Sequence, residues 1–268
     1  MSVRKTVNSW VFDRTAPGLH LPKLSLGPTF INPTILQQCS TSKVIIVPSD
    51  GIDSIELAVK YWIAAAGSIH TISIEEGCHK IEGEYLRIGY EYPLTIQGVG
   101  SNLTKLNGGI RCMNATTNLK LIDLSISNRR AASPQISRHG LFVNDGAKCE
   151  AIRCAFVDCG GSGVCCNNTK VSLIDCVCNR NSRAGLYAVN GGNITLHGST
   201  TFQAIDNGKD STNCQLEASG TDSTIIGLLR LENMNVIGNT VIQWDRCLGR
   251  NKSWVAPHTR EKYGGIVT

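Results

Sequence analysis

The sequence predicts an all-β fold in which the chain winds into a parallel β-helix, a solenoid with coils of about 22 residues. A frame of glycine, an apolar residue, any residue and a small or apolar residue recurs with spacings of 31, 23 and 22 residues. It starts at Gly109, Gly140, Gly163 and Gly185. The 27 glycines and the 6% of aromatic residues suit tight turns around a narrow core. One unit is too small to bury its own apolar face, so the units must stack.

The apolar segments of the repeat predict two sheets of stacked parallel strands. One sheet should hold residues 119–124, 149–154, 171–176 and 193–197, and the other 110–112, 141–143, 164–166 and 186–188. We expect an inward ladder of aliphatic residues, spaced 30, 22 and 22 apart: Ile122, Ile152, Ile174 and Leu196. Asparagine tolerates the left-handed conformation of tight turns. A turn ladder is therefore expected from Asn114, Asn144, Asn167 and Asn190.

The region before the repeat predicts a cap for the open end of the solenoid. Asp53 should cap a helix that runs from Ser54 to about Ala66, and Gly67 should end it. Its apolar face would comprise Ile55, Ala58, Val59, Trp62 and Ile63. Short strands are expected at 72–74, 78–81, 86–88 and 94–96. A helix at this end would cover strand edges that otherwise template aggregation.

Three regions follow from these patterns: an extended, proline-rich basic arm at 1–43, the β-helix at 44–243 with its capping helix near 53–67, and a basic extension at 244–268. The net charge of +5 is uneven, with +4 in the arm and +3 in the C-terminal extension. Four prolines and the lack of a period argue against a helix or a central strand in the arm. Such an arm can lie on its own β-helix, bind a neighbouring subunit or stay disordered.

Both terminal regions contain large apolar residues among basic ones, which predicts contacts with an acidic surface. The expected partner-binding residues are Trp10, Phe12, Arg14, Phe30, Trp244 and Trp254.

The twelve cysteines include seven between positions 149 and 178, and none forms a C-x-x-C pair. This spacing gives little support to zinc or thioredoxin chemistry, and we expect no metal and no cofactor. The first residues lack the apolar region of a secretory signal, so we expect a reducing location, in the cytoplasm or within a virus particle. Cys154 and Cys176 should then be neighbours in a buried, reduced ladder. No stretch approaches the length of a membrane span, so no membrane insertion is expected.

The segments SIELAVKYWIAAAG, ISIEEGCHKIEGEYLRI and YPLTIQGVG resemble the N-terminal cap and first coils of pectin-lyase-like proteins. GLFVNDGAKCEAIRC, GVCCNNTKVSLIDC and GLYAVNGGNITLHG resemble their later coils. The resemblance covers about residues 44–243 and implies a right-handed parallel β-helix. The sequence is most similar in style to the generic, non-catalytic β-helix proteins of unicellular algae and large algal DNA viruses. It does not define a function, because the same fold carries lyases, hydrolases, adhesins and virion proteins.

If the protein were an enzyme, the resemblance would imply one of two sites. One is a carboxylate cluster that binds Ca²⁺ beside a basic residue, and the other is the paired carboxylates of a glycosidase. The sequence has neither an Asn-Thr-Asp nor an Asp-Asp segment, which leaves His139 and Asp145 as weak catalytic candidates. Asp145 lies in an Asn-Asp-Gly segment, which predicts a tight turn more strongly than a catalytic role. Asp123 and Asp175, each after Leu-Ile, could form a carboxylate row or a solvated ladder.

A basic loop should lie over the coil at 126–138, where it could hold a sulfated or uronic sugar or simply be solvated. It contains Arg129, Arg130 and Arg138.

These observations favour a non-catalytic structural or interaction protein that belongs to a large assembly such as a virus particle. Its partners would be other protein subunits, among them further copies of itself. The alternative is a polysaccharide lyase, a glycoside hydrolase or a carbohydrate-binding protein on the same fold. We expect no nucleic acid, because the sequence contains no phosphate loop, no nucleophile elbow and no nucleic-acid-binding module.

Overall fold

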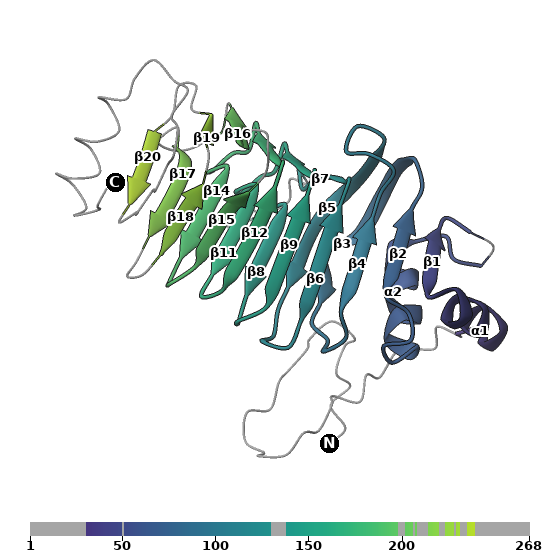
Figure 1. Cartoon of the computed structure of the whole chain (residues 1–268). Coiled ribbons are helices and arrows are strands. Elements are labelled where there is room, and N and C mark those ends of the chain that lie inside the picture. Colours follow the sequence, from purple (N-terminus) through teal and green to yellow (C-terminus); the bar gives the residue numbers. More distant parts are fainter. Residues whose placement is uncertain are drawn as a thin grey trace, which may run out of the picture.

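The computed structural model describes residues 31–49, 51–129, 138–197 and parts of 202–238. In these residues the chain forms a parallel β-solenoid of about 6 turns, which confirms the predicted fold class (Figure 1). Residues 1–30 and 239–268 lie outside the described part, and so does Arg130. The predictions for Trp10, Phe12, Arg14, Phe30, Trp244 and Trp254 therefore fall outside it as well.

One face of the solenoid is an eight-stranded, all-parallel sheet that contains the first predicted set of strands. Its strands, in spatial order, are β1 (Val44–Val47), β2 (Thr71–Ile74), β4 (Leu94–Gln97), β6 (Asn118–Ile122), β9 (Lys148–Ile152), β12 (Lys170–Ile174), β15 (Asn193–His197) and β18 (Thr224–Gly227). Each coil adds one strand, so equivalent residues of successive coils lie next to each other.

The other strands form a twelve-stranded sheet that bends into two limbs at β5 (Thr104–Cys112). The first half of β5 pairs with β7 and the second half with β8, and β3 (Gly77–Ile88) lies beside both halves. The β8 limb continues through β8 (Leu141–Asn144), β11 (Val164–Asn167), β14 (Leu186–Val189), β17 (Cys214–Ser219) and β20 (Asn235–Gly238). The β7 limb comprises β7 (Ser125–Ser127), β10 (Ala155–Val157), β13 (Val177–Asn179), β16 (Phe202–Ile205) and β19 (Leu229–Arg230).

The second predicted set of strands, with the central segments 141–143, 164–166 and 186–188, is confirmed in the β8 limb. The bend falls at Gly108, whose φ of 139° is open to glycine. A Cβ at this position would lie 2.5 Å from the Cβ of Ile81.

The inward ladder of the eight-stranded sheet differs from the predicted one by a single residue. Leu121, Ala151, Leu173 and Leu196 are buried and in register, so the prediction is confirmed only for Leu196. The prediction that Ile122, Ile152 and Ile174 point inward is wrong. They are half-buried in the outward row, because neighbouring residues of a strand point to opposite faces.

The predicted asparagine turn ladder is present in a modified form. The left-handed turn residues with φ between 51° and 77° are Asn114, Asp145, Asn168 and Asn190. Asn144 and Asn167 precede this row as the paired last residues of β8 and β11. The side-chain amide of Asn190 donates to Oδ1 of Asn167 at 3.0 Å, so coil-to-coil amide contact is retained.

The corner between the two limbs carries a second, buried asparagine ladder that the sequence did not suggest. Asn181 Nδ2 donates to the Phe156 carbonyl at 3.1 Å and to Asn207 Oδ1 at 2.8 Å, and its Oδ1 accepts from the backbone N–H of Cys159 at 3.0 Å. Asn207 Nδ2 in turn donates to the Cys178 carbonyl at 2.8 Å. Asn128 occupies the same corner and donates to the carbonyls of Glu84 and His139. These amides satisfy backbone groups that the sharp corner leaves without strand partners.

The predicted capping helix is α2 (Ile55–Ala64), which buries Ile55, Ala58, Val59, Tyr61 and Trp62. Its N-cap is Ser54 rather than Asp53: the Ser54 hydroxyl accepts from the backbone N–H of Leu57 at 3.2 Å. The expected strands at 78–81 and 86–88 are parts of the single strand β3.

A further helix, α1 (Pro33–Ser42), lies in the region predicted to be an extended arm, so that prediction is wrong for residues 33–42. Pro33 occupies the first turn, where a missing N–H costs nothing, and Asn32 Oδ1 accepts from the backbone N–H of Thr34. The helix packs Ile35, Leu36 and Cys39 against the core.

Ten cysteines of the described part are unbridged, and eight of them are buried. Cys154 and Cys176 are buried at neighbouring positions of successive coils, as predicted. Their reduced state in the cell stays a prediction.

Candidate functional site

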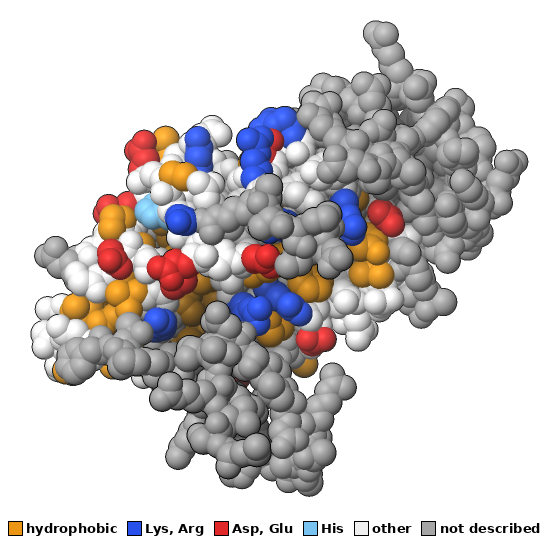
Figure 2. Space-filling view, turned by 180° about the vertical axis from the view of Figure 1, so that it is seen from behind, with side chains coloured by type: hydrophobic (Ala, Val, Ile, Leu, Met, Phe, Trp, Pro, Cys, Tyr) orange, Lys and Arg blue, Asp and Glu red, His pale blue; other side chains and the backbone are white. Residues whose placement is uncertain are grey.

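The variable third position of the repeat frame forms an outward ladder on the β8 limb. In register, its members are Arg111, Phe142, Cys165 and Tyr187, and Glu217 of β17 extends the ladder from outside the frame. We call the surface made by Arg111, Phe142, Arg183, Tyr187 and Glu217 the arginine–aromatic face. Figure 2 shows apolar, acidic and basic side chains intermixed on the side of the solenoid opposite to that of Figure 1. Because the frame leaves this position free of core packing, it can vary and carry function.

An arginine and two rings stack at one end of this face. The guanidinium carbon of Arg111 lies 5.0 Å from the centre of the Phe142 ring, within the range of a cation–π contact. The His139 ring lies 5.6 Å from the same ring, tilted by 40°. The stack holds the Arg111 side chain across the strands.

His139 is a buried, neutral residue that supports the face from below. Its Nδ1 accepts from the backbone N–H of Ser162 at 3.0 Å, and its own backbone N–H donates to the Tyr85 hydroxyl at 2.8 Å. Burial lowers the pKa of His139 to about 4, and the positive charge of Arg183 acts in the same direction. A neutral imidazole with Nδ1 already engaged is a structural group rather than a proton donor at neutral pH.

The polar groups at the other end of the face are also shifted toward their neutral forms. Burial raises the pKa of Tyr187, and it raises the pKa of Glu217 while Arg183 opposes the shift. Burial likewise raises the pKa of the Tyr85 hydroxyl. The face therefore offers aromatic surface, guanidinium groups and a carboxyl group, the combination that can hold a polar ring or an anionic side chain.

The structure does not bring the two catalytic candidates together. His139 precedes β8 and Asp145 follows it, and the four strand residues between them span roughly 13 Å. Asp145 adopts a left-handed turn conformation, and its Oδ2 accepts from the Asn144 amide at 2.6 Å. This arrangement does not provide the shared site that an acid–base pair needs.

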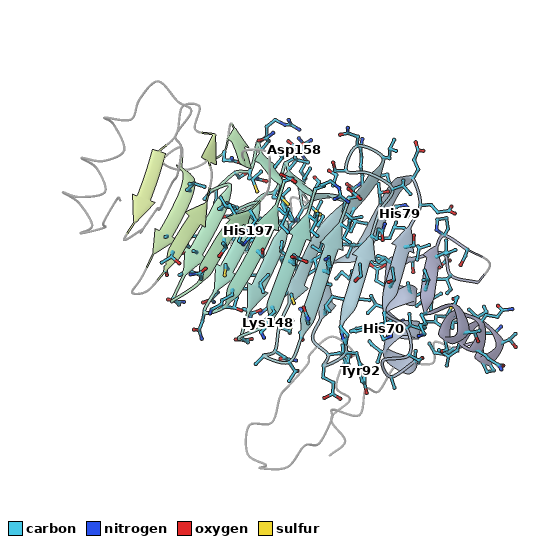
Figure 3. All side chains as sticks on the ribbon, in the orientation of Figure 1. His70, His79, Tyr92, Lys148, Asp158 and His197 are labelled. Atoms are coloured by element: carbon cyan, nitrogen blue, oxygen red, sulfur yellow. The ribbon has the colours of Figure 1, made fainter. Side chains whose placement is uncertain are left out.

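The basic loop residues that the structure describes are engaged with carboxylates on two different elements. Arg129 forms an ion pair with Asp158, which also accepts two hydrogen bonds of 3.0 Å from Arg180. These arginines, Arg180 first, hold the pKa of Asp158 below its ordinary value. Arg138 is buried, with Nη2 3.5 Å from Oε1 of Glu84. Asp158 lies at the upper edge of the solenoid in Figure 3.

Asp123 and Asp175 occupy equivalent turn positions, as predicted, but the row between them is not purely acidic. Arg153 stands at the intervening position and donates two hydrogen bonds of 2.7 Å to Asp123. The three residues form an alternating charge ladder, which replaces the hypothesis of a carboxylate row that binds a cation.

In the described ranges, no group of three or more His, Cys, Asp and Glu side chains could hold a metal ion. His70, His79 and His197 lie far apart in Figure 3. Among the same residues, neither helix has the length and apolar character needed to cross a bilayer.

No family model matches the sequence, and no curated protein matches it. Among solved structures, the comparison finds the ORF18 protein of Geobacillus virus E2, with a TM-score of 0.27 and 10% sequence identity. The match covers 66% of this chain and 45% of that chain, so this chain spans less than half of the viral protein. A likeness at this TM-score carries no argument about function.

Proposed function

We propose that this protein is a non-catalytic structural component of a larger assembly, of which a virus particle is one example. The β-helix would serve as a rigid body and the terminal segments as contacts with other subunits. One observation supports the proposal: the polar side chains of the coils are used in coil-to-coil pairs. Asp123 pairs with Arg153, Asp158 pairs with Arg180, and Asn181 bonds to Asn207.

This use of polar groups differs from the arrangement that catalysis requires. A catalytic site aims a few groups at a reacting atom and tunes their pKa values for proton transfer. Here two arginines hold the pKa of Asp158 below its ordinary value, and burial keeps His139 neutral near pH 7. The polar pairs instead join neighbouring coils and are not aimed at a common reacting atom, which favours a structural role for the solenoid.

The experiment is deletion of residues 1–30 followed by sedimentation of the native particle. The deletion must end at residue 30, because α1 packs on the core and the backbone N–H of Asn32 donates to the Tyr61 hydroxyl at 3.0 Å. We expect the melting temperature to change by less than about 2 °C and incorporation into the large species to be lost. Normal assembly of the truncated chain would contradict the proposal.

A second candidate, carbohydrate binding, is favoured by the arginine–aromatic face. Rings stack on the apolar faces of sugars, and guanidinium groups bind carboxylate or sulfate substituents. A polysaccharide panel, tested for binding and for cleavage with and without Ca²⁺, separates this function from the first. Tyr187→Ala should abolish binding, whereas Val157→Ala, on the β7 limb, should leave it unchanged.

A further inference from the structure

An apolar stripe lies on the solvent side of the eight-stranded sheet, where its strands end. Ile122, Ile152 and Ile174 are neighbours in β6, β9 and β12, about 4.8 Å apart, and all three are half-buried. Beyond Ile122 the row continues with the polar residues Gln97 and Ser73 before it reaches Ile46 on β1, so the apolar stripe consists of the three isoleucines. Apolar ladders on an outward face are costly in water and mark contact surfaces.

Charged turn residues border this stripe on one side. Asp123, Arg153 and Asp175 directly follow the three isoleucines. Glu75 and Glu76, both exposed, follow β2 at the same edge. Four carboxylates against one arginine give this border a net charge of −3. On the other side of the stripe, Lys120 and Glu150 neutralise each other in an ion pair of 2.8 Å. We call the isoleucines and the charged border the isoleucine corner.

Residues 1–30 of this chain have the complementary composition. They carry Arg4, Lys5, Arg14 and Lys23 against Asp13, a net charge of +3. Their large apolar residues include Trp10, Phe12, Leu19, Leu21 and Phe30. We propose that residues 1–30 dock along the isoleucine corner, with Trp10 and Phe12 on the isoleucines and the basic residues beside the acidic border.

The length of the segment is compatible with this site. The described chain begins at Ile31, which packs against the core, and α1 contacts β1. From β1 to β12 the sheet advances by five strand spacings, or about 24 Å. Thirty extended residues reach about 100 Å. The segment can therefore span its own corner or that of an adjacent copy. The inference rests on the proposed function in one respect: in an assembly, the segment of one copy would occupy the corner of the next.

The test is photo-cross-linking in the full chain with p-benzoylphenylalanine in place of Phe12. We expect cross-links to peptides that contain Ile122, Ile152 or Ile174. A mixture of isotopically labelled and unlabelled chains tells whether the corner belongs to the same copy or to a neighbour. Ile152→Lys removes an apolar contact and adds a positive charge that repels the basic residues of the segment 1–30. It should lower the cross-link yield at least about fivefold. The matched control Val157→Lys replaces a half-buried aliphatic residue on the β7 limb and should leave the yield unchanged. Melting curves verify that both variants fold.

Cross-links on the arginine–aromatic face, or a yield unaffected by Ile152→Lys, would overturn the docking site. p-Benzoylphenylalanine at position 152 should cross-link to residues 1–30. A cross-link from this position to the isoleucine corner of another copy would also overturn the docking site. The two proposals can fail separately. Loss of assembly on deletion of residues 1–30 with cross-links elsewhere leaves only the proposed function. Cross-links at the corner with normal assembly of the truncated chain leave only the docking site.

Discussion

Two corners of the solenoid place their polar residues in opposite environments. The corner after the eight-stranded sheet holds Asp123, Arg153 and Asp175 at the surface, with the Arg153 side chain 56% exposed. The corner between the limbs buries Asn181 completely, with Asn128 and Asn207 nearly so. Exposed ion pairs contribute little to stability, whereas buried amides must keep every hydrogen bond. The exposed corner with Asp123, Arg153 and Asp175, here called the wet corner, is therefore available for contacts. The buried asparagine corner, here called the dry corner, maintains the fold.

The largest effect should separate the inward row of the eight-stranded sheet from its outward row. Two adjacent residues, Leu173 and Ile174, belong to these two rows. Leu173→Asp places a carboxylate in the core and should lower the free energy of unfolding by about 4 kcal/mol or more. Ile174→Asp, one residue later in the outward row, should lower it by about 1 kcal/mol or less. Urea unfolding measures both. Equal losses for the two variants would contradict the observed register.

The next effect probes the dry corner itself. Asn181→Ala leaves the Cys159 N–H and the Phe156 carbonyl without their Asn181 partner and removes the side-chain hydrogen bond to Asn207, whose Oδ1 still accepts from the backbone N–H of residue 181. Since each orphaned buried group costs about 1–3 kcal/mol, we expect a loss of roughly 3–4 kcal/mol after partial relaxation. Asn167→Ala, which removes the exposed amide contact to Asn190 at a residue outside the left-handed turn positions, is the matched control and should cost far less. Thermal unfolding of the two variants gives the comparison.

Low pH should destabilise the buried region around His139. Its pKa is about 4 in the folded chain, below the ordinary value of 6.5. Between these values the unfolded chain binds the extra proton, so stability is complete above pH 6.5 and falls as the pH drops toward 4. At about 1.4 kcal/mol per pH unit, the loss approaches roughly 3 kcal/mol. His139→Gln should remove this slope. An identical pH dependence in wild type and variant would show that His139 does not cause it.

The smallest effect belongs to the wet corner. Arg153→Met removes both hydrogen bonds to Asp123, yet the pair lies in water and should scarcely change the unfolding midpoint. The small difference should vanish in about 1 M NaCl, where the Debye length falls to about 3 Å and exposed charges are strongly screened. A large loss in this variant would mean that the charge ladder, like the asparagine ladder, maintains the fold.

The repeat frame made the strands predictable because glycine and apolar spacing mark each coil. It placed 110–112, 141–143, 164–166 and 186–188 in one sheet without error. The sequence before the repeat also located α2 from its apolar face, although it assigned the N-cap to Asp53 instead of Ser54. The sequence analysis missed α1 because it counted Pro33 among four prolines that argue against a helix, whereas Pro33 occupies the first turn, where proline is favoured.

The candidate site was less predictable, because its residues come together across coils of different length. Phe142 and Tyr187 occupy the variable third position of the frame. Because this position recurs in every coil, the sequence does contain the signal for an outward ladder. Arg183 and Glu217 carry no local signal, since they lie outside the frame and meet this ladder only through stacking. His139 was predicted as a catalytic candidate because sequence reports the residue type and not its burial.

The sequence by itself determined the period, and the period determined which strands are neighbours, because stacking coils is the only way for such short units to bury their apolar residues. Only the tertiary structure decided which side of each strand faces the core. Leu173 and Ile174 are both apolar and adjacent, and the pleat sends one inward and the other outward. The closure of the coil at its turns makes that choice. By making it, the fold turned the isoleucines into an outer surface.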